Sequence, residues 1–228
     1  FSKLVNNMPC VAVNSGTSAL HLMLLGHNIG PGDEVIIPSF TFAATANAVS
    51  LTGATPVFAD IKLDTLCIDP MDVVNKITNR TRAIMPVHLF GNMADMPTLK
   101  KIADDYSLLL FEDAAQAHLA KQFGKPAGTW GDGGIFSFYP TKNMTTGEGG
   151  IVVVRDQSVE RKIRMLRNQG MEIRYQNEIV GLNNRMTEIS AAIGLVQLKR
   201  LAKFTKMRRD IAFKYKNSLR DVEFQKVE

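Results

Sequence analysis

The chain has 228 residues, of which 45% are hydrophobic and 21% are charged, and this is enough apolar material for one large domain with its own core. It contains no run of eighteen apolar residues and no signal-peptide pattern, so we expect no membrane span, and its formal net charge is +5. Two cysteines, Cys10 and Cys67, are too few for a disulfide framework, and the four histidines match no zinc spacing. We therefore expect a cytoplasmic protein with reduced thiols and no metal site.

Strand-like and helix-like segments alternate along the first two thirds of the chain. Short apolar runs predict strands at Cys10–Val13, Glu34–Ile37, Thr55–Phe58, Arg82–Val87, Leu108–Phe111, Gly134–Phe138 and Ile151–Val154. Helical patterns predict helices at Thr17–Leu25, Ala43–Leu51, Asp72–Ile77 and Met96–Asp105. Several strands are apolar throughout, which is typical of strands covered on both faces. The pattern predicts an α/β layer fold with a mostly parallel sheet.

The chain becomes helical and basic after Arg155. Residues 155–228 carry 17 Lys and Arg against 9 Asp and Glu, a net of +8, whereas residues 1–154 carry 10 and 13, a net of −3. Apolar residues recur among these charges at helical spacing, which favours a solvated helix face over a nucleic-acid-binding surface. We predict a long helix from about Met186 to Leu219, a break around Gly170–Gly181, and a linker near the C-terminus.

Three groups of polar residues follow predicted strands, where ligands bind in open α/β sheets. The first is Gly16-Thr17-Ser18, which opens a helix with free backbone N–H groups, hydroxyls and the positive end of the helix dipole. That combination suits a phosphate, although the residues taken alone fit a simple helix cap better. The second is Glu112-Asp113, which could serve a metal, a ribose or a cationic ring nitrogen, or could merely begin a helix.

The third group is the most specific. Lys142 leaves an apolar strand and enters a segment rich in glycine, which ends at Gly149-Gly150. Burying an ammonium group is costly, so a lysine in such a place has a lowered pKa and becomes an amine nucleophile. The alternative is a loop lysine that reaches solvent.

Together these motifs resemble the DegT/StrS family of pyridoxal-phosphate (PLP) dependent nucleotide-sugar aminotransferases, which have the aspartate-aminotransferase fold. The resemblance runs from about Val11 to about Lys199. Its matching stretches are residues 15–20, 38–42, 86–91, 112–118, 137–150 and 181–185. It implies the three-layer large domain of a fold-type I enzyme, with helices on both faces of the sheet. We expect that domain at residues 1–205, without the family's leading segment, and a linker helix with the start of a truncated small domain at 206–228.

The family's roles map onto single residues of this chain. Lys142 resembles the lysine that holds PLP as a Schiff base, and Asp113 the carboxylate paired with the pyridinium nitrogen, which makes the ring an electron sink. Gln116 resembles the residue near the phenolic oxygen of the ring. Phe42 resembles the aromatic side chain that stacks on the ring.

The remaining matches concern the phosphate. Gly16, Thr17 and Ser137 resemble the phosphate cradle, and Ser18 is expected to assist them. Asn183 resembles a phosphate ligand that comes from the other subunit, so the resemblance implies a homodimer with shared sites. Other expected partners are small molecules, and we expect neither nucleic acid nor membrane.

The resemblance implies transfer of an amino group, with glutamate as donor, to a keto group of a nucleotide-linked sugar. Such a reaction belongs to amino-sugar, cell-surface polysaccharide or antibiotic-sugar biosynthesis. One rival is a PLP-dependent sugar dehydratase on the same fold, but in those relatives a histidine replaces the lysine found here as Lys142. A second rival is a non-catalytic regulatory protein that retains the domain. A dinucleotide-binding protein is disfavoured because no G-x-G-x-x-G follows the first strand.

Two neighbouring residues add further expectations. Leu119 stands where the family usually has glycine, and we expect it to alter the turn or its packing. His118 lies close enough in sequence to Asp113 to orient that carboxylate from behind.

Overall fold

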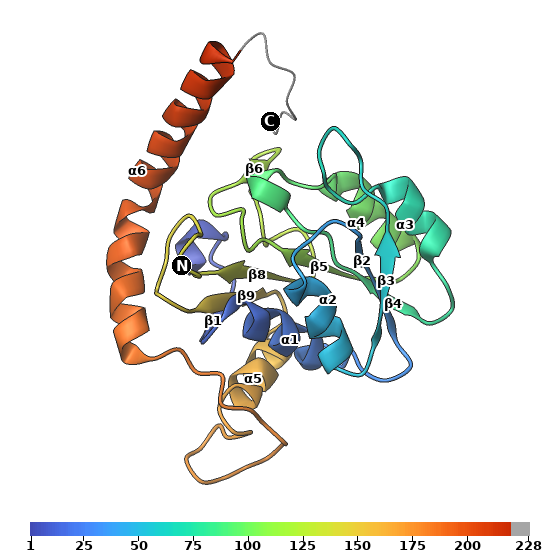
Figure 1. The fold of residues 1–228 in the computed structure, drawn as a ribbon. Helices are drawn as coiled ribbons and strands as arrows, with labels where there is room; N and C mark the ends of the chain where they lie inside the picture. The colour runs from blue at the N-terminus through green and yellow to red at the C-terminus, as the bar shows by residue number, and fades with distance from the viewer. Residues whose placement is uncertain (220–228) are drawn as a thin grey trace.

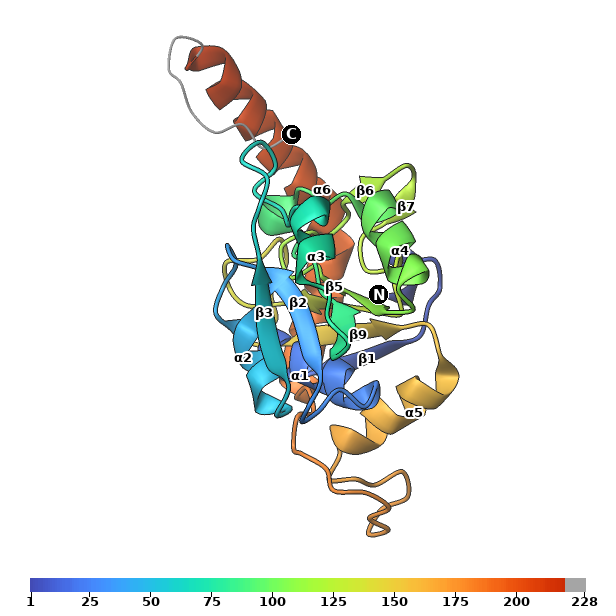
Figure 2. The same ribbon diagram turned by 90° about the vertical axis from the view of Figure 1, so that its right-hand side faces the viewer.

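The computed structural model describes residues 1–219, which form a seven-stranded sheet between two layers of helices (Figures 1 and 2). In spatial order the strands are β1 (Cys10–Val13), β9 (Gly150–Val154), β8 (Gly133–Ser137), β5 (Leu109–Asp113), β4 (Thr81–Ile84), β2 (Glu34–Pro38) and β3 (Thr55–Ala59). All neighbours pair in parallel except β9, which is antiparallel to both β1 and β8. The predicted mostly parallel sheet is confirmed. A short hairpin of β6 (Lys121–Gln122) and β7 (Lys125–Pro126) lies apart from it.

Helices cover both faces of the sheet, as predicted. One face carries α1 (Gly16–Gly26), α2 (Ala44–Leu51) and α5 (Gln157–Leu166), and the other carries α3 (Pro70–Lys76) and α4 (Met96–Asp105). Alternate residues of one strand enter different cores: Val35 and Ile37 pack in the core under α1, whereas Ile36 packs in the core under α4. Both cores must be filled, which is why consecutive positions at the centres of the strands are apolar, as in Val35-Ile36-Ile37.

Short polar side chains set where the helices begin. A Ser, Thr or Asp side chain accepts a backbone N–H of the first turn in α1, α3, α4, α5 and α6 (Glu188–Ser218). The capping residues are Ser15, Asp69, Asp95, Asp156 and Thr187. Single-turn 3₁₀ helices, η1 (Ser2–Leu4) and η2 (Leu89–Gly91), complete the elements.

The predicted strand Arg82–Val87 is too long at its C-terminal end. Regular pairing of β4 stops at Ile84, although Val87 still forms a single bridge with Asp113. The His88 N–H donates to the Asp113 carbonyl at 3.0 Å, and the Asp113 N–H donates to the Pro86 carbonyl at 3.0 Å. These two bonds hold the end of β5 at the point where the segment after β4 leaves the sheet.

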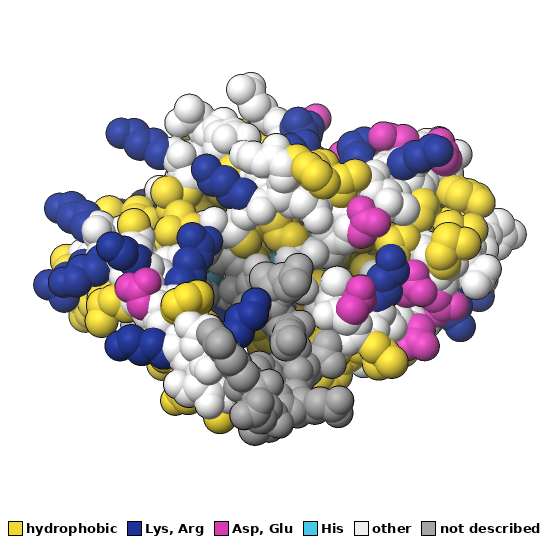
Figure 3. All heavy atoms as spheres, turned by 90° about the horizontal axis from the view of Figure 1, so that it is seen from above, with side chains coloured by type: hydrophobic (Ala, Val, Ile, Leu, Met, Phe, Trp, Pro, Cys, Tyr) yellow, Lys and Arg dark blue, Asp and Glu magenta, His cyan; other side chains and the backbone are white. Residues whose placement is uncertain are grey.

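The long predicted helix exists as α6, which runs along one side of the molecule and projects beyond it (Figure 1). Among its described side chains only Leu201 is buried. Lys and Arg side chains gather on the side of the molecule where α6 lies, and Asp and Glu on the opposite side (Figure 3). Residues 206–218 continue α6 without a break, and 220–228 lie outside the described residues, so the expected domain boundary after residue 205 stays a prediction. Within residues 1–219, no helix is both long enough and apolar enough to span a bilayer.

Candidate active site

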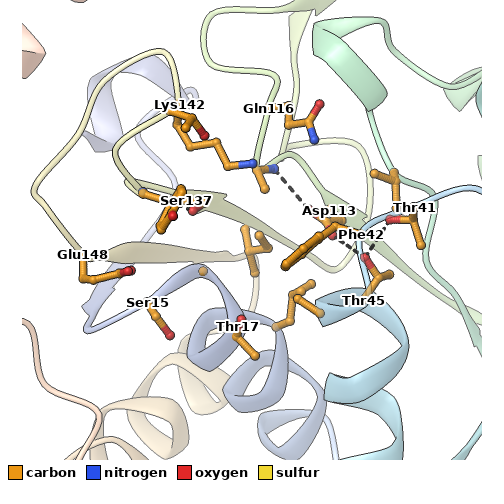
Figure 4. A pocket seen from close by; sticks show the side chains of 18 residues that line it. Ser15, Thr17, Thr41, Phe42, Thr45, Asp113, Gln116, Ser137, Lys142 and Glu148 are labelled. Carbon is orange, nitrogen blue, oxygen red and sulfur yellow. Dashed lines mark hydrogen bonds between the residues drawn. The ribbon is translucent and has the colours of Figure 1, made fainter.

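A pocket of about 560 Å³ lies at the carboxyl ends of β5 and β8, beside the first turns of α1 and α2 (Figure 4). Most of the predicted site residues line it: Gly16, Thr17, Phe42, Asp113, Gln116, Ser137 and Lys142. They come from four separate stretches of the chain. The sheet brings them together because β5 and β8 are parallel neighbours, and β1 and β2, which precede Gly16 and Phe42, end at the same edge of the sheet.

The first turn of α1 forms one wall of the pocket and packs tightly against β8 and β9. A Cβ added to Gly16 would lie 2.8 Å from the Cβ of Ser137, and one added to Gly150 would lie 2.6 Å from the Ser15 carbonyl oxygen. Only glycine at these two positions lets the start of α1 approach the last residue of β8 and the first residue of β9 so closely. The result places the hydroxyls of Thr17 and Ser137 beside a positive helix end, an arrangement that suits a phosphate.

Asp113 presents a nearly buried carboxylate to the pocket, with 5% of the residue exposed. Its Oδ2 accepts the hydroxyl of Thr45 at 2.9 Å, and its Oδ1 accepts the Ala115 N–H at 3.1 Å. Burial raises the pKa of Asp113, while these two hydrogen bonds and the positive charge of Lys142 oppose the rise. A cationic ring nitrogen placed here would therefore stabilise the ionised form of Asp113, which burial disfavours.

Lys142 lies in the loop that joins β8 to β9. Hydrogen bonds close the base of this loop, from Phe138 N–H to the Gly149 carbonyl at 2.8 Å and from Thr146 N–H to the Phe138 carbonyl at 3.0 Å. The lysine side chain extends over the pocket toward Asp113 and Gln116 (Figure 4). Burial lowers the pKa of Lys142, and the Asp113 carboxylate opposes that shift. A larger fraction of the amine is therefore uncharged and nucleophilic at neutral pH.

Gln116 and Phe42 complete the opposite side of the pocket. The Gln116 Oε1 accepts the Phe90 N–H at 2.7 Å, so its oxygen faces η2 and its NH₂ is the free, hydrogen-donating end. Phe42 is 74% exposed in the described chain, an unusual state for a phenylalanine at the edge of a pocket. A flat aromatic ligand would cover it.

Glu112, next to Asp113, faces the other side of the sheet and has a structural role. It is fully buried and accepts backbone N–H groups of Gly128, Trp130 and Gly131 at 2.8, 2.6 and 3.2 Å. Its Oε2 also lies 3.0 Å from Nε2 of His88. Of the two acidic residues, only Asp113 belongs to the pocket.

The expectation for His118 was wrong, because this side chain makes no hydrogen bond to Asp113. It is 3% exposed and packs among the rings of Phe1, Phe136 and Phe138, and neither ring nitrogen makes a hydrogen bond of good geometry. Burial lowers its pKa to about 4, and the nearby Asn143 side chain only partly opposes this. His118 is thus a neutral core residue behind the lysine loop.

Leu119 lies in a tight turn and adopts a strained backbone conformation there. Its φ of 66° lies in the left-handed region that favours glycine, and the Ala120 N–H closes the turn on the Ala117 carbonyl at 3.0 Å. The leucine side chain is half-buried against the core beside α4. The expected effect of Leu119 on the turn or its packing, relative to a glycine, stays a prediction.

Two predicted residues do not line the pocket. The Ser18 hydroxyl pairs with that of Ser15 at 2.9 Å, so Ser18 supports the helix start instead. Asn183 is exposed in the segment between α5 and α6, which extends past α5 at the bottom of Figure 1. Conversely, the sequence did not single out several residues that do line it: Ser15, Thr41, Thr45, Tyr139, Thr141 and Glu148. All of them except Thr45 lie in stretches that resemble the family, but no role was assigned to them, and Thr45 lies outside those stretches.

The fold and the pocket together define the large domain of a fold-type I aminotransferase. The DesV protein of S. venezuelae, solved in complex with a ketimine intermediate, matches 96% of this chain with a TM-score of 0.93 and 44% identity, over 59% of its own length. NtdA from Bacillus subtilis, solved with bound PMP, matches all of this chain with a TM-score of 0.92 and 33% identity, over 54% of its own length.

The chain belongs to the DegT/DnrJ/EryC1/StrS aminotransferase family, whose sequence profile matches residues 1–228. A GDP-perosamine synthase of Caulobacter vibrioides is 47% identical over 211 residues, which are 92% of this chain and 57% of that protein. The chain thus spans somewhat more than half the length of the relatives it matches.

Proposed function

We propose that the protein is a PLP-dependent aminotransferase that moves an amino group, with glutamate as donor, to a keto group of a nucleotide-linked sugar. The observation that carries the proposal is the placement of the Lys142 amine and the Asp113 carboxylate around one pocket that begins at a helix N-terminus. The family membership and the sugar-modifying relative support the choice of substrate class. A cytoplasmic location, expected from the unpaired cysteines, is part of the same proposal.

The residues present fit the cofactor. The α1 start would hold its phosphate, since a Cβ at Gly16 would fill the space in front of Ser137. Asp113 would pair with a protonated ring nitrogen, and Phe42 would cover one face of the ring. Bound PLP supplies an electron sink for charge that develops at the α-carbon of an amino donor.

Each residue then has a defined task. Asp113 keeps the proton on the ring nitrogen, because separating that ion pair in a nearly buried site is costly. The Nζ of Lys142, uncharged in an increased fraction of molecules, would accept a proton from the α-carbon of the amino donor and return it to the C4′ carbon of the bound cofactor. The β8–β9 loop holds the lysine above the pocket during this transfer.

Visible absorption of the protein with added PLP tests the proposal. We expect a yellow band that bleaches with glutamate and is absent in Lys142→Ala. A matched control is Lys125→Ala, since Lys125 also has a pKa lowered by burial but packs over the Trp130 ring, 4.5 Å from its centroid, outside the pocket. A folded protein with PLP present but without the band would refute the assignment and favour the regulatory alternative.

The proposal includes a homodimer in which Asn183 completes the pocket of the second copy. Asn183 does not line its own pocket, and the residues before and after it in the sequence, up to the first turns of α6, expose many apolar side chains, a sign of a protein interface. They are Ile173, Tyr175, Val180, Leu182, Ile189, Ile193, Leu195 and Val196.

Complementation tests the shared site. If Asn183 serves the partner, a heterodimer of Lys142→Ala with Asn183→Ala contains one fully intact pocket and should recover about half of the wild-type activity per dimer, because the other pocket lacks both groups. If Asn183 serves its own pocket, the mixture has no intact pocket and stays inactive. Either variant expressed alone provides the baseline.

A further inference from the structure

A pair of threonines on the α2 side of the pocket forms a hydrogen-bonded chain that ends on Asp113. Thr45 is 1% exposed, and its Oγ1 lies 2.9 Å from the Asp113 Oδ2 although the two residues are 68 positions apart. The Oγ1 of Thr41 lies 2.9 Å from that of Thr45. Figure 4 shows both bonds as a line from Thr41 through Thr45 to the carboxylate.

The direction of the chain follows from the number of hydrogens. A threonine hydroxyl has one hydrogen to donate, and a carboxylate can only accept, so the Thr45 hydrogen points to Asp113. Thr41 must then donate its hydrogen to Thr45. Each donation polarises the next, which strengthens the bond that reaches the carboxylate.

The chain opposes the effect of burial on Asp113. Burial favours the protonated carboxyl, and the groups that favour the ionised form are the Ala115 N–H, the Thr45 hydroxyl, Lys142 across the pocket and His88 behind the strand. The Ala115 donor belongs to the backbone and is fixed, and it holds Oδ1 while Thr45 holds Oδ2. Thr45 is therefore the donor that a side-chain substitution can remove without changing Lys142 or His88.

The chain also ties the carboxylate to Phe42. Thr41 and Thr45 flank Phe42, and the Thr45 N–H donates to the Phe42 carbonyl at 3.1 Å. The turn that carries the aromatic side chain is thus fixed to the strand end that carries the acid.

We propose that Thr45, supported by Thr41, is a positioning residue that keeps Asp113 ionised and aimed into the pocket. The inference rests on the proposed function, in which a carboxylate is required at a cationic ring nitrogen. Neither threonine contacts the reacting atoms in this account, and both act through Asp113.

Carbon-13 NMR titration of the Asp113 carboxyl in the protein as encoded, before PLP is added, tests the chain directly. Asp113→Asn assigns the resonance. Thr45→Val keeps the shape and removes the hydroxyl, and we expect the ionisation constant of Asp113 to fall tenfold or more. Thr45→Ser should restore it, and Thr41→Val should act in the same direction but less. The matched control is Thr52→Val, which removes another buried, hydrogen-bonded hydroxyl at the end of the same helix, away from the pocket.

A second readout uses the loaded enzyme. The acidic limb of the kcat profile should move to higher pH in Thr45→Val, with the KM for the amino donor unchanged. An Asp113 that titrates alike in Thr45→Val and wild type would overturn the proposal, as would a shift that serine does not reverse. Because the titration needs no cofactor, a failure of PLP to bind would count against the proposed function alone.

Discussion

Acid should destabilise this protein through His118. The folded-state pKa of about 4 compares with about 6.5 for a histidine in an unfolded chain. Between these values the unfolded chain binds a proton that the folded protein does not, so this contribution to stability is complete above about pH 6.5 and is lost as the pH falls. Each pH unit in that window corresponds to about 1.4 kcal/mol, so acidification to about pH 4.5 should remove about 2–3 kcal/mol.

Urea unfolding of wild type, His118→Leu and His118→Gln across this pH range measures the effect. Other groups titrate too, so the informative quantity is the difference in unfolding free energy between wild type and variant at each pH, at fixed cofactor concentration. Both variants lack the ionisable ring and should lose less stability than wild type on acidification. The gap, defined as the unfolding free energy of the variant minus that of wild type, should therefore rise by about 1.4 kcal/mol for each pH unit that the pH falls. A gap that stays constant with pH would show that His118 is protonated or solvated in the folded state and would refute the reasoning.

Three further substitutions test single contacts. Leu119→Gly should be more stable than Leu119→Ala by about 1 kcal/mol in urea unfolding. Both variants lose the packing of the leucine side chain beyond Cβ, but only glycine is unstrained at a φ of 66°. Equal stability of the two variants would show that the turn relaxes. Gly16→Ala should weaken PLP binding at least tenfold in a fluorescence titration, because its methyl group meets Ser137, whereas Gly30→Ala, whose nearest added contact is at 3.8 Å, should bind normally. Glu112→Gln should lower the unfolding free energy by about 3 kcal/mol, since its NH₂ would face backbone donors; an unchanged urea midpoint would contradict the role assigned to Glu112.

Most of the elements were predictable because each follows from local pattern. The strands at residues 10–13 and 151–154 and the helix at 96–105 agree with the structure to within a residue. The end of β4 was not predictable, because Met85 and Val87 are as apolar as the strand. Met85 still donates its N–H to the Ile36 carbonyl and Val87 forms a single bridge with Asp113, but the regular ladder stops at Ile84. Core packing and ladder pairing use the same residue types, so composition does not separate them.

The site was predictable only in part. Lys142 follows an apolar strand and Asp113 ends one, so each carries its own signal in the sequence. Thr45 carries none, because a threonine in a helix is ordinary and its partner is 68 residues away. The surroundings of His118 also come from distant residues, among them Phe1, so nearness in sequence to Asp113 gave the wrong partner.

Glu112 and Asp113 are adjacent on β5 yet belong to different sides of the sheet. Insertion or deletion of a single residue before this pair would turn each carboxylate to the opposite side, since side chains alternate along a strand. The loop at residues 128–131 would lose its acceptor, and the pocket would receive a side chain one atom longer and wrongly aimed. Length changes in β5 should therefore be far less tolerated during evolution than substitutions, and variation in length should be confined to the connections on either side.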